Sequence, residues 1–273
     1  MPYVTTSDGV ELFVKDWGAG RPVVLIHGWP LSADTWDELA LTLAQSGYRA
    51  IAYDRRGFGR SDQPWHGYDY DRFADDLADV MTELDLQDAT IVGFSMGGGE
   101  VARYLSRHGT GRVRQAALLG SIVPYLLKTD DNPHGVPAEA LGEIAAGIRD
   151  DRAAFFQTFF RTFYGLGLLS QPVSHAILEN SWRQAMMAGL HPILAAANAF
   201  GTTDLRADLS AFTIPTLIVH GTGDEIVPID TSSRAAARAI PQAKLIEYDG
   251  APHGLLATHP QEIARDMLAF LNG

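Results

Sequence analysis

Cysteine is absent from the 273 residues of this sequence. The chain can therefore form no disulfide bond and no metal site with thiolate ligands, and we take a reducing cytoplasm as its expected location. The first ten residues lack the basic and apolar segments of a signal peptide. The longest apolar stretch, Ala116 to Leu127, is interrupted by glycine, serine and proline and is too short to cross a bilayer. We expect no membrane insertion.

Positive charge is also scarce. The sequence contains 21 Lys and Arg against 33 Asp and Glu, which gives a formal net charge of −12. Binding of nucleic acid depends on basic side chains that neutralise phosphates, so this balance argues against a nucleic-acid partner. The H-E-x-x-H pattern of metalloproteases does not occur, and the 9 histidines are scattered. We therefore expect no metal ion and no other cofactor.

Short apolar runs alternate with helical patterns along most of the chain. Runs that are apolar on both faces are typical of parallel strands covered by helices. The expected strands are Val10–Lys15, Val23–Ile26, Ala50–Tyr53, Thr90–Phe94, Ala116–Leu119, Thr216–Val219 and Lys244–Tyr248. The expected helices include Trp36–Gln45, Asp71–Leu84, Ser232–Ala239 and Gln261–Leu271. This alternation predicts a mainly parallel α/β sheet with right-handed connections.

The alternation is interrupted from the middle of the chain to about three quarters of its length. Residues 125–205 contain a polar, proline-containing opening and then helical sequence rich in Phe, Met and Trp, without a strand pattern. We interpret this segment as a helical cap insertion whose aromatic side chains face the sheet. Residues 1–124 and 206–273 would then form the α/β core.

A serine flanked by glycines follows the expected strand Thr90–Phe94. Gly93-Phe94-Ser95-Met96-Gly97 has the spacing G-x-S-x-G, and two more glycines follow at once. In a nucleophile elbow, a tight strand-to-helix turn exposes the serine hydroxyl, and bulky neighbours would make the two backbones clash. Glycines in a first helical turn otherwise cost about 1 kcal/mol each relative to alanine. We expect Gly98 and Gly99 to let the helix pack flush against neighbouring strands.

A serine nucleophile requires a base, and elbow enzymes place the acid and then the histidine later in the chain. Asp224 lies in a glycine-rich turn directly after the strand Thr216–Val219, and His253 follows the strand Lys244–Tyr248. Open α/β sheets bind their ligands at such carboxyl ends of strands. Ser95, Asp224 and His253 are thus the expected catalytic residues, with Glu225, Asp249 and His259 as weaker competitors.

Two backbone N–H groups are expected to stabilise an oxyanion. One is that of Met96, directly after the nucleophile. The other should come from the loop after Val23–Ile26, where Trp29 can donate and Pro30 has no N–H. The arginine-rich stretch Asp54–Asp62 is better interpreted as a buried turn network than as a catalytic element.

Taken together, these motifs resemble the α/β-hydrolase fold, and within it the bacterial cofactor-free haloperoxidases, perhydrolases and arylesterases. The resemblance covers nearly the whole chain, and it rests on the segments Phe13–Gly18, His27–Asp34, Asp54–Pro64, Gly93–Tyr104, His220–Pro228 and Ala251–Gly254. It implies a triad of Ser95, Asp224 and His253, with oxyanion donors at Trp29 and Met96.

The resemblance also implies an activity. Ser95 would form an acyl-enzyme from a small aryl or alkyl ester, and water would release the acid. Hydrogen peroxide would instead release a peracid, which can oxidise bromide in solution without haem or metal. The partners implied are therefore a small ester and hydrogen peroxide, and relatives often form trimers or hexamers.

The substrate pocket is expected to be small and apolar. Its expected residues are Trp29, Pro30, Ile122, Phe159, Phe163 and Ile226. A proline favours an extended conformation of the residue before it. Pro30 could thereby turn the Trp29 carbonyl into the pocket, where it would accept a hydrogen bond from peroxide. Members of the family with proline here resemble the perhydrolases.

Other activities fit the same three residues. A γ-lactamase, a lactone or amide hydrolase, and a carbon–carbon hydrolase would all use Ser95, Asp224 and His253. A haloalkane dehalogenase or an epoxide hydrolase is disfavoured, because these enzymes carry Asp at the elbow. A non-catalytic small-molecule receptor with a hydrolase fold is a further alternative, which multiple turnovers would exclude.

Overall fold

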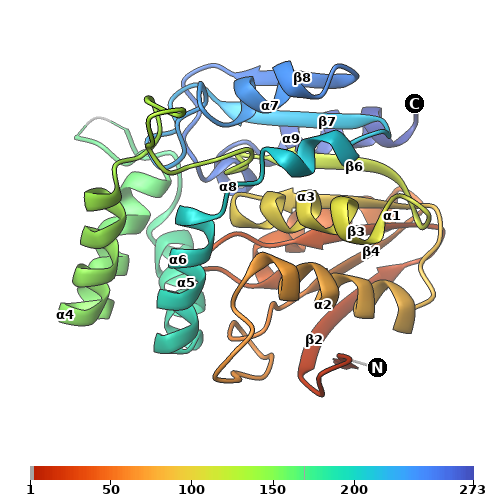
Figure 1. Cartoon of the computed structure of the whole chain (residues 1–273), viewed down its shortest axis with the longest axis horizontal. Helices are drawn as coiled ribbons and strands as arrows, with labels where there is room; N and C mark the ends of the chain where they lie inside the picture. The colour runs from red at the N-terminus through yellow and green to blue at the C-terminus, as the bar shows by residue number, and fades with distance from the viewer. Residues whose placement is uncertain (1–2, 169) are drawn as a thin grey trace.

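The computed structural model describes residues 3–168 and 170–273, and their strands form one eight-stranded sheet (Figure 1). The strand order is β1-β2-β4-β3-β5-β6-β7-β8. The first two pairings, β1 with β2 and β2 with β4, are antiparallel, and all the others are parallel. The strands are β1 (Tyr3–Thr5), β2 (Glu11–Gly18), β3 (Arg21–Ile26), β4 (Tyr48–Tyr53), β5 (Ala89–Phe94), β6 (Val113–Leu119), β7 (Thr216–Gly221) and β8 (Ala243–Tyr248).

Helices cover both faces of this sheet. One face carries α1 packed against α9, and the other carries α2 packed against α3 (Figure 1). The helices are η1 (Ala33–Trp36), α1 (Asp37–Gln45), α2 (Tyr70–Glu83), α3 (Met96–His108), α4 (Ala138–Phe163), α5 (His175–Met187), α6 (Leu190–Thr202), η2 (Ala207–Ala211), α7 (Ser233–Ala239), α8 (Leu255–Thr258) and α9 (Pro260–Leu271). The predicted fold class, a helix-covered and mainly parallel sheet, is confirmed.

Each expected strand is present, with bounds that differ by a few residues. The short strand β1 was not predicted, because three residues at a sheet edge leave no pattern in the sequence. The expected helix from Trp36 begins one residue later, since Ala33–Trp36 forms a 3-10 turn in which the Asp34 amide donates to the Ser32 hydroxyl. The helix then ends before Gly47, whose φ of +86° is in the region that favours glycine.

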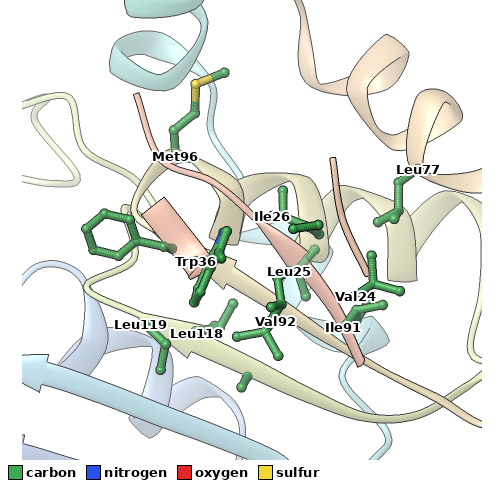
Figure 2. Packing of buried hydrophobic residues seen from close by; sticks show 14 of the residues in the cluster. Val24, Leu25, Ile26, Trp36, Leu77, Ile91, Val92, Met96, Leu118 and Leu119 are labelled. Carbon is green, nitrogen blue, oxygen red and sulfur yellow. The ribbon is translucent and has the colours of Figure 1, made fainter. Parts of the chain in front are cut away.

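The core lies between the sheet and its covering helices. Neighbouring strands contribute side chains that are completely or almost completely buried. Figure 2 shows part of this packing, in which side chains from β3, β5 and β6 lie in one cluster with Trp36 of η1 and Leu77 of α2. The strand residues are Val24, Leu25, Ile26, Ile91, Val92, Leu118 and Leu119. The buried strands hold the loops at their carboxyl ends in fixed positions.

Three helices, α4, α5 and α6, lie between β6 and β7 in the sequence and project from one end of the sheet (Figure 1). The C-terminal end of the chain lies on the opposite side of the molecule from α4. The backbone of α4 is not helical at Asp151 (φ −148°, ψ 92°), which divides this helix into two halves. Within the described residues, no helix is both long and apolar enough to cross a membrane.

The stretch Asp54–Asp62 forms the buried network that the sequence predicted. Arg55 is fully buried and its Nε lies 2.8 Å from Oε2 of Glu100, which is also fully buried. Arg56 pairs with the buried Asp76 at 2.6 Å, and Arg60 pairs with Asp54. Burying a charge is costly unless it is paired, so these pairs fix the loop after β4.

Replacing Glu100 by leucine should destabilise the fold by about 3–5 kcal/mol, because the substitution leaves the Arg55 guanidinium buried without its carboxylate. The free energy of unfolding in urea measures this loss. Arg55→Met combined with Glu100→Leu is the matched control and should recover much of the stability. A Glu100→Leu variant as stable as the parent protein would contradict the importance of this pair.

Candidate active site

Ser95 lies in a strained turn between β5 and α3. Its backbone has φ +54° and ψ −119°, which is rare for a residue with a side chain. A Cβ on Gly93 would lie 2.4 Å from the Gly97 carbonyl oxygen, and a Cβ on Gly97 would lie 2.4 Å from the carbonyl oxygen of Ile26 in β3. These two glycines thus permit the close approach that the G-x-S-x-G spacing predicted.

The next two glycines match the expected role only in part. A Cβ on Gly98 would lie 2.0 Å from Oγ of Ser121, in the loop after β6, and 3.4 Å from the Leu118 side chain in β6 itself. A Cβ on Gly99 would lie 2.6 Å from the ring of Tyr70 in α2. Gly98 therefore permits close packing on β6 and the loop after it, whereas Gly99 makes room for a helix and not for a strand.

The structure brings Ser95, His253 and Asp224 together at the carboxyl ends of β5, β8 and β7. Nε2 of His253 lies 2.9 Å from Oγ of Ser95, and Nδ1 of the same ring lies 2.6 Å from Oδ2 of Asp224. All three residues are buried. This is the hydrogen-bonded chain in which a histidine can remove the serine proton while a carboxylate orients the ring.

Asp224 is held as a carboxylate. The N–H groups of Ile226 and Val227 donate to its Oδ1 at 2.9 and 2.8 Å. Burial alone would raise the pKa of Asp224, but the charge of His253 and the hydrogen bonds from His220 and His253 hold it well below its ordinary value. Asp224 therefore stays ionised throughout the neutral pH range.

His220 is a neighbour of the site that sequence reasoning missed. Its ring is completely buried at the end of β7, with Nε2 3.1 Å from Oδ2 of Asp224 and 3.0 Å from the Val227 carbonyl. Nδ1 lies 2.6 Å from the Ser233 hydroxyl in α7. The ring therefore braces the Asp224 turn. In the sequence, the signal for this role was the position of His220 four residues before Asp224.

The competing residues lie apart from this chain of hydrogen bonds. Glu225 and Asp249 are exposed, and Asp249 accepts a hydrogen bond from Thr222 at 3.3 Å. The ring of His259 lies beside the Thr258 hydroxyl at 2.8 Å and packs against Tyr248. None of these three side chains contacts Ser95.

The two expected oxyanion donors belong to segments that meet at Ser95. A Cβ on Gly28 would lie 2.9 Å from Cβ of Ser95, so the loop carrying Trp29 passes directly beside the nucleophile. Met96 begins α3, and its carbonyl accepts a hydrogen bond from Tyr70 at 3.0 Å. Backbone donors at a helix start are suited to stabilising developing negative charge.

A small apolar cavity of about 60 Å³ lies over the nucleophile. Four of the expected pocket residues line it together with Ser95 and His253, namely Trp29, Ile122, Phe159 and Ile226. The cavity has further lining residues that were not predicted from the sequence. They are Leu126 and Val136 between β6 and α4, Leu141 and Ile144 in α4, Phe200 in α6, and Val227 in the Asp224 turn.

Two expected pocket residues lie outside this lining. Phe163 packs edge-on against the His253 ring, with centroids 4.9 Å apart, because it lies one turn beyond Phe159 on α4. Pro30 is buried directly after Trp29. The Trp29 ring fills the space nearest the cavity, packs against Phe159 and Phe200, and donates from Nε1 to the Ile193 carbonyl at 3.0 Å.

Other hollows do not contain the three hydrogen-bonded residues. A groove of about 480 Å³ lies between α4 and α5, and one of about 330 Å³ lies between α4 and α6. Across residues 3–168 and 170–273, no group of three or more His, Cys, Asp or Glu side chains is placed to hold a metal ion.

Comparison with known proteins agrees with this geometry. Residues 21–260 match the family model described as alpha/beta hydrolase fold. The chain is 47% identical to "Non-heme chloroperoxidase CPO-A1" of Kitasatospora aureofaciens over 100% of both chains. It is 41% identical to "Bifunctional esterase/perhydrolase DCH" of Acinetobacter calcoaceticus over 99% of both.

The similarity extends to solved structures. A bromoperoxidase from Bacillus anthracis superposes with a TM-score of 0.96 at 43% identity, over 99% of both chains. An esterase from Exiguobacterium antarcticum superposes with a TM-score of 0.94 at 28% identity, again over 99% of both chains. The chain therefore belongs to the alpha/beta hydrolase fold family, and within it to the group of the non-heme haloperoxidases and esterase/perhydrolases.

Proposed function

We propose that this protein is a serine hydrolase that forms an acyl-enzyme on Ser95 from small carboxylic esters and transfers the acyl group to water or hydrogen peroxide. The observation that carries the proposal is the pair of hydrogen-bond distances at His253, 2.9 Å to Ser95 and 2.6 Å to Asp224, beneath a small apolar cavity. The names of the relatives, which include haloperoxidases and an esterase/perhydrolase, support the same reaction.

The reaction proceeds in two steps. In the first, Ser95 Oγ attacks the ester carbonyl, its proton passes to Nε2 of His253, and the alcohol leaves with that proton. The backbone N–H groups of Trp29 and Met96 stabilise the oxyanion. In the second, His253 takes a proton from water or hydrogen peroxide, whose oxygen attacks the acyl carbon. Ser95 leaves with the proton, and the product is an acid or a peracid.

The cavity limits the acyl group. At about 60 Å³ the cavity is much smaller than the several hundred Å³ of a typical ligand pocket. Acetyl and similarly short acyl groups therefore fit, and the surrounding apolar side chains favour them over charged ones. Peracid released into solution would oxidise bromide, which accounts for the haloperoxidase names of the relatives.

Pro30→Leu should lower the ratio of peracid to acid. We propose that Pro30 turns the Trp29 carbonyl toward the cavity, where it accepts a hydrogen bond from bound peroxide. Because one hydrogen bond contributes about 0.5–1.5 kcal/mol, the expected change is about two- to tenfold. The measurement is the ratio of peracetic to acetic acid at a fixed peroxide concentration. An unchanged ratio would leave Pro30 a structural residue of the loop.

The acyl-enzyme is the most direct test of the proposed function. A burst of 4-nitrophenolate from 4-nitrophenyl acetate, followed by a slower steady state, reports its accumulation. Mass spectrometry of a quenched sample should find one acetyl group on the peptide containing Ser95. With substrate in excess, absence of the burst together with absence of the acetyl group from samples quenched during turnover would count against the proposal.

Further features stay predictions of the sequence and the resemblance. We propose that residues 125–205, including α4, α5 and α6, act as a cap over the α/β core formed by residues 1–124 and 206–273. Phe159 and Phe200 from these helices line the cavity, which supports that role. A cytoplasmic location and assembly into trimers or hexamers are likewise proposed.

A further inference from the structure

Two hollows meet at one side chain of α4. The inner one is the cavity of about 60 Å³ at Ser95, and the outer one is the groove of about 330 Å³ between α4 and α6. Leu141 lines both of them. The rest of the groove is mostly apolar, lined by Leu127, Ala138, Gly142, Ala145, Arg149, Leu194, Ala197, Asn198 and Thr202. Leu141 therefore separates the reacting atoms from a larger apolar space.

The packing around Leu141 shows why this separation depends on one side chain. A Cβ on Gly201, in α6, would lie 2.9 Å from Cδ1 of Leu141, so the backbone of α6 closes directly on this leucine. On the other side, Val136 lines the cavity while its bridge partner Leu127 lines the groove. Leu141 is the side chain that lines both spaces.

The half of α4 that carries Leu141 has few buried contacts. Before the break at Asp151, Ile148 is its one buried residue, whereas Phe156, Phe160 and Phe163 are all buried after it. Segments with few buried apolar contacts open at low free-energy cost. The first half of α4 can therefore shift to accommodate a ligand, while the second half stays fixed on the core.

We propose that Leu141 sets the acyl-chain length that the site accepts, and that the groove between α4 and α6 holds the distal carbons of longer, unbranched acyl chains. This inference rests on the proposed acyl-enzyme at Ser95. A chain that passes Leu141 exchanges water for apolar side chains such as Ala145 and Leu194, and each buried methylene then adds to binding. In the parent protein the intact Leu141 side chain hinders a long chain from reaching the groove, so short acyl groups should be preferred.

The octanoate preference is kcat/KM for 4-nitrophenyl octanoate divided by kcat/KM for 4-nitrophenyl acetate. Replacing Leu141 by alanine should raise this ratio by about tenfold or more. Leu141→Val, which removes less of the side chain, should raise the same ratio by a smaller factor and guards against misfolding of the alanine variant. Leu178→Ala is the matched control, because Leu178 lies on α5 and lines the separate groove between α4 and α5.

Each outcome has one meaning. A raised ratio in both Leu141 variants with an unchanged ratio in Leu178→Ala supports the proposal. An unchanged ratio in the Leu141 variants overturns it, and so does an equal rise in Leu178→Ala, which would indicate general loosening of the helices. If the parent protein cleaves neither ester, the proposed function fails. If it cleaves the acetate and only the ratio fails to respond, the chain-length inference alone is wrong.

Discussion

Ser95→Ala should lower kcat for 4-nitrophenyl acetate by a factor on the order of 10⁶, the largest effect expected from any single substitution discussed. The variant loses Oγ of Ser95, the nucleophile of the proposed mechanism, which lies 2.9 Å from Nε2 of His253. Covalent catalysis is then impossible, although the oxyanion donors and the cavity remain. Initial rates at high enzyme concentration measure the residual activity.

The substitution is small enough to separate chemistry from folding. Ser95 has φ +54°, which strains an alanine and a serine alike, so the thermal midpoint should change little. Circular dichroism and a melting curve provide the control. Ester hydrolysis that survives intact in a folded Ser95→Ala protein would refute the mechanism.

Asp224→Asn should lower kcat by about 10⁴. The carboxylate lies 2.6 Å from Nδ1 of His253 and fixes the tautomer in which Nε2 can accept the serine proton. An amide in its place can donate to Nδ1 and so favours the wrong tautomer. Glu225→Gln is the matched control, because Glu225 is the exposed neighbour in the same turn and should retain full activity.

The pH dependence of stability follows from the same carboxylate. The pKa of Asp224 in the folded protein lies below its ordinary value of 3.8, so the ionised carboxylate stabilises the fold fully when the pH is well above 3.8. As the pH falls below this value toward the folded-state pKa, that stabilisation is lost. The difference in unfolding free energy between the parent protein and Asp224→Asn should therefore be constant near neutrality and shrink in acid. A difference that grows on acidification would contradict the assigned direction.

The sequence was most informative where burial is complete. Parallel strands covered on both faces produce continuous apolar runs, and this is why β3 to β7 could be predicted. Ser95, Asp224 and His253 each follow a strand of the parallel part of the sheet, and parallel strands align their carboxyl ends, so the meeting of these residues could be inferred from the sequence. The elbow glycines Gly93 and Gly97 could be explained in the same way, since the clash that they avoid is local.

The sequence was least informative where distant segments pack together. The partner of Arg55 is Glu100, 45 positions away, and no local pattern distinguishes that glutamate from an exposed one. Leu141 and Phe200 reach the cavity through the packing of α4 against α6, which no local sequence pattern encodes. Phe163 shares the helical spacing of Phe159, yet one turn of α4 moves it from the cavity to the face of His253.

We propose that one acyl group on Ser95 is shared between water and hydrogen peroxide. The most direct measurement supplies a simple acetate ester with and without hydrogen peroxide and quantifies acetic and peracetic acid, with Ser95→Ala beside the parent protein. We predict acetic acid alone without peroxide, peracetic acid formed at its expense with peroxide, and neither product above background in Ser95→Ala. Acetic acid alone at every peroxide concentration, or equal peracid from Ser95→Ala, would contradict the claim.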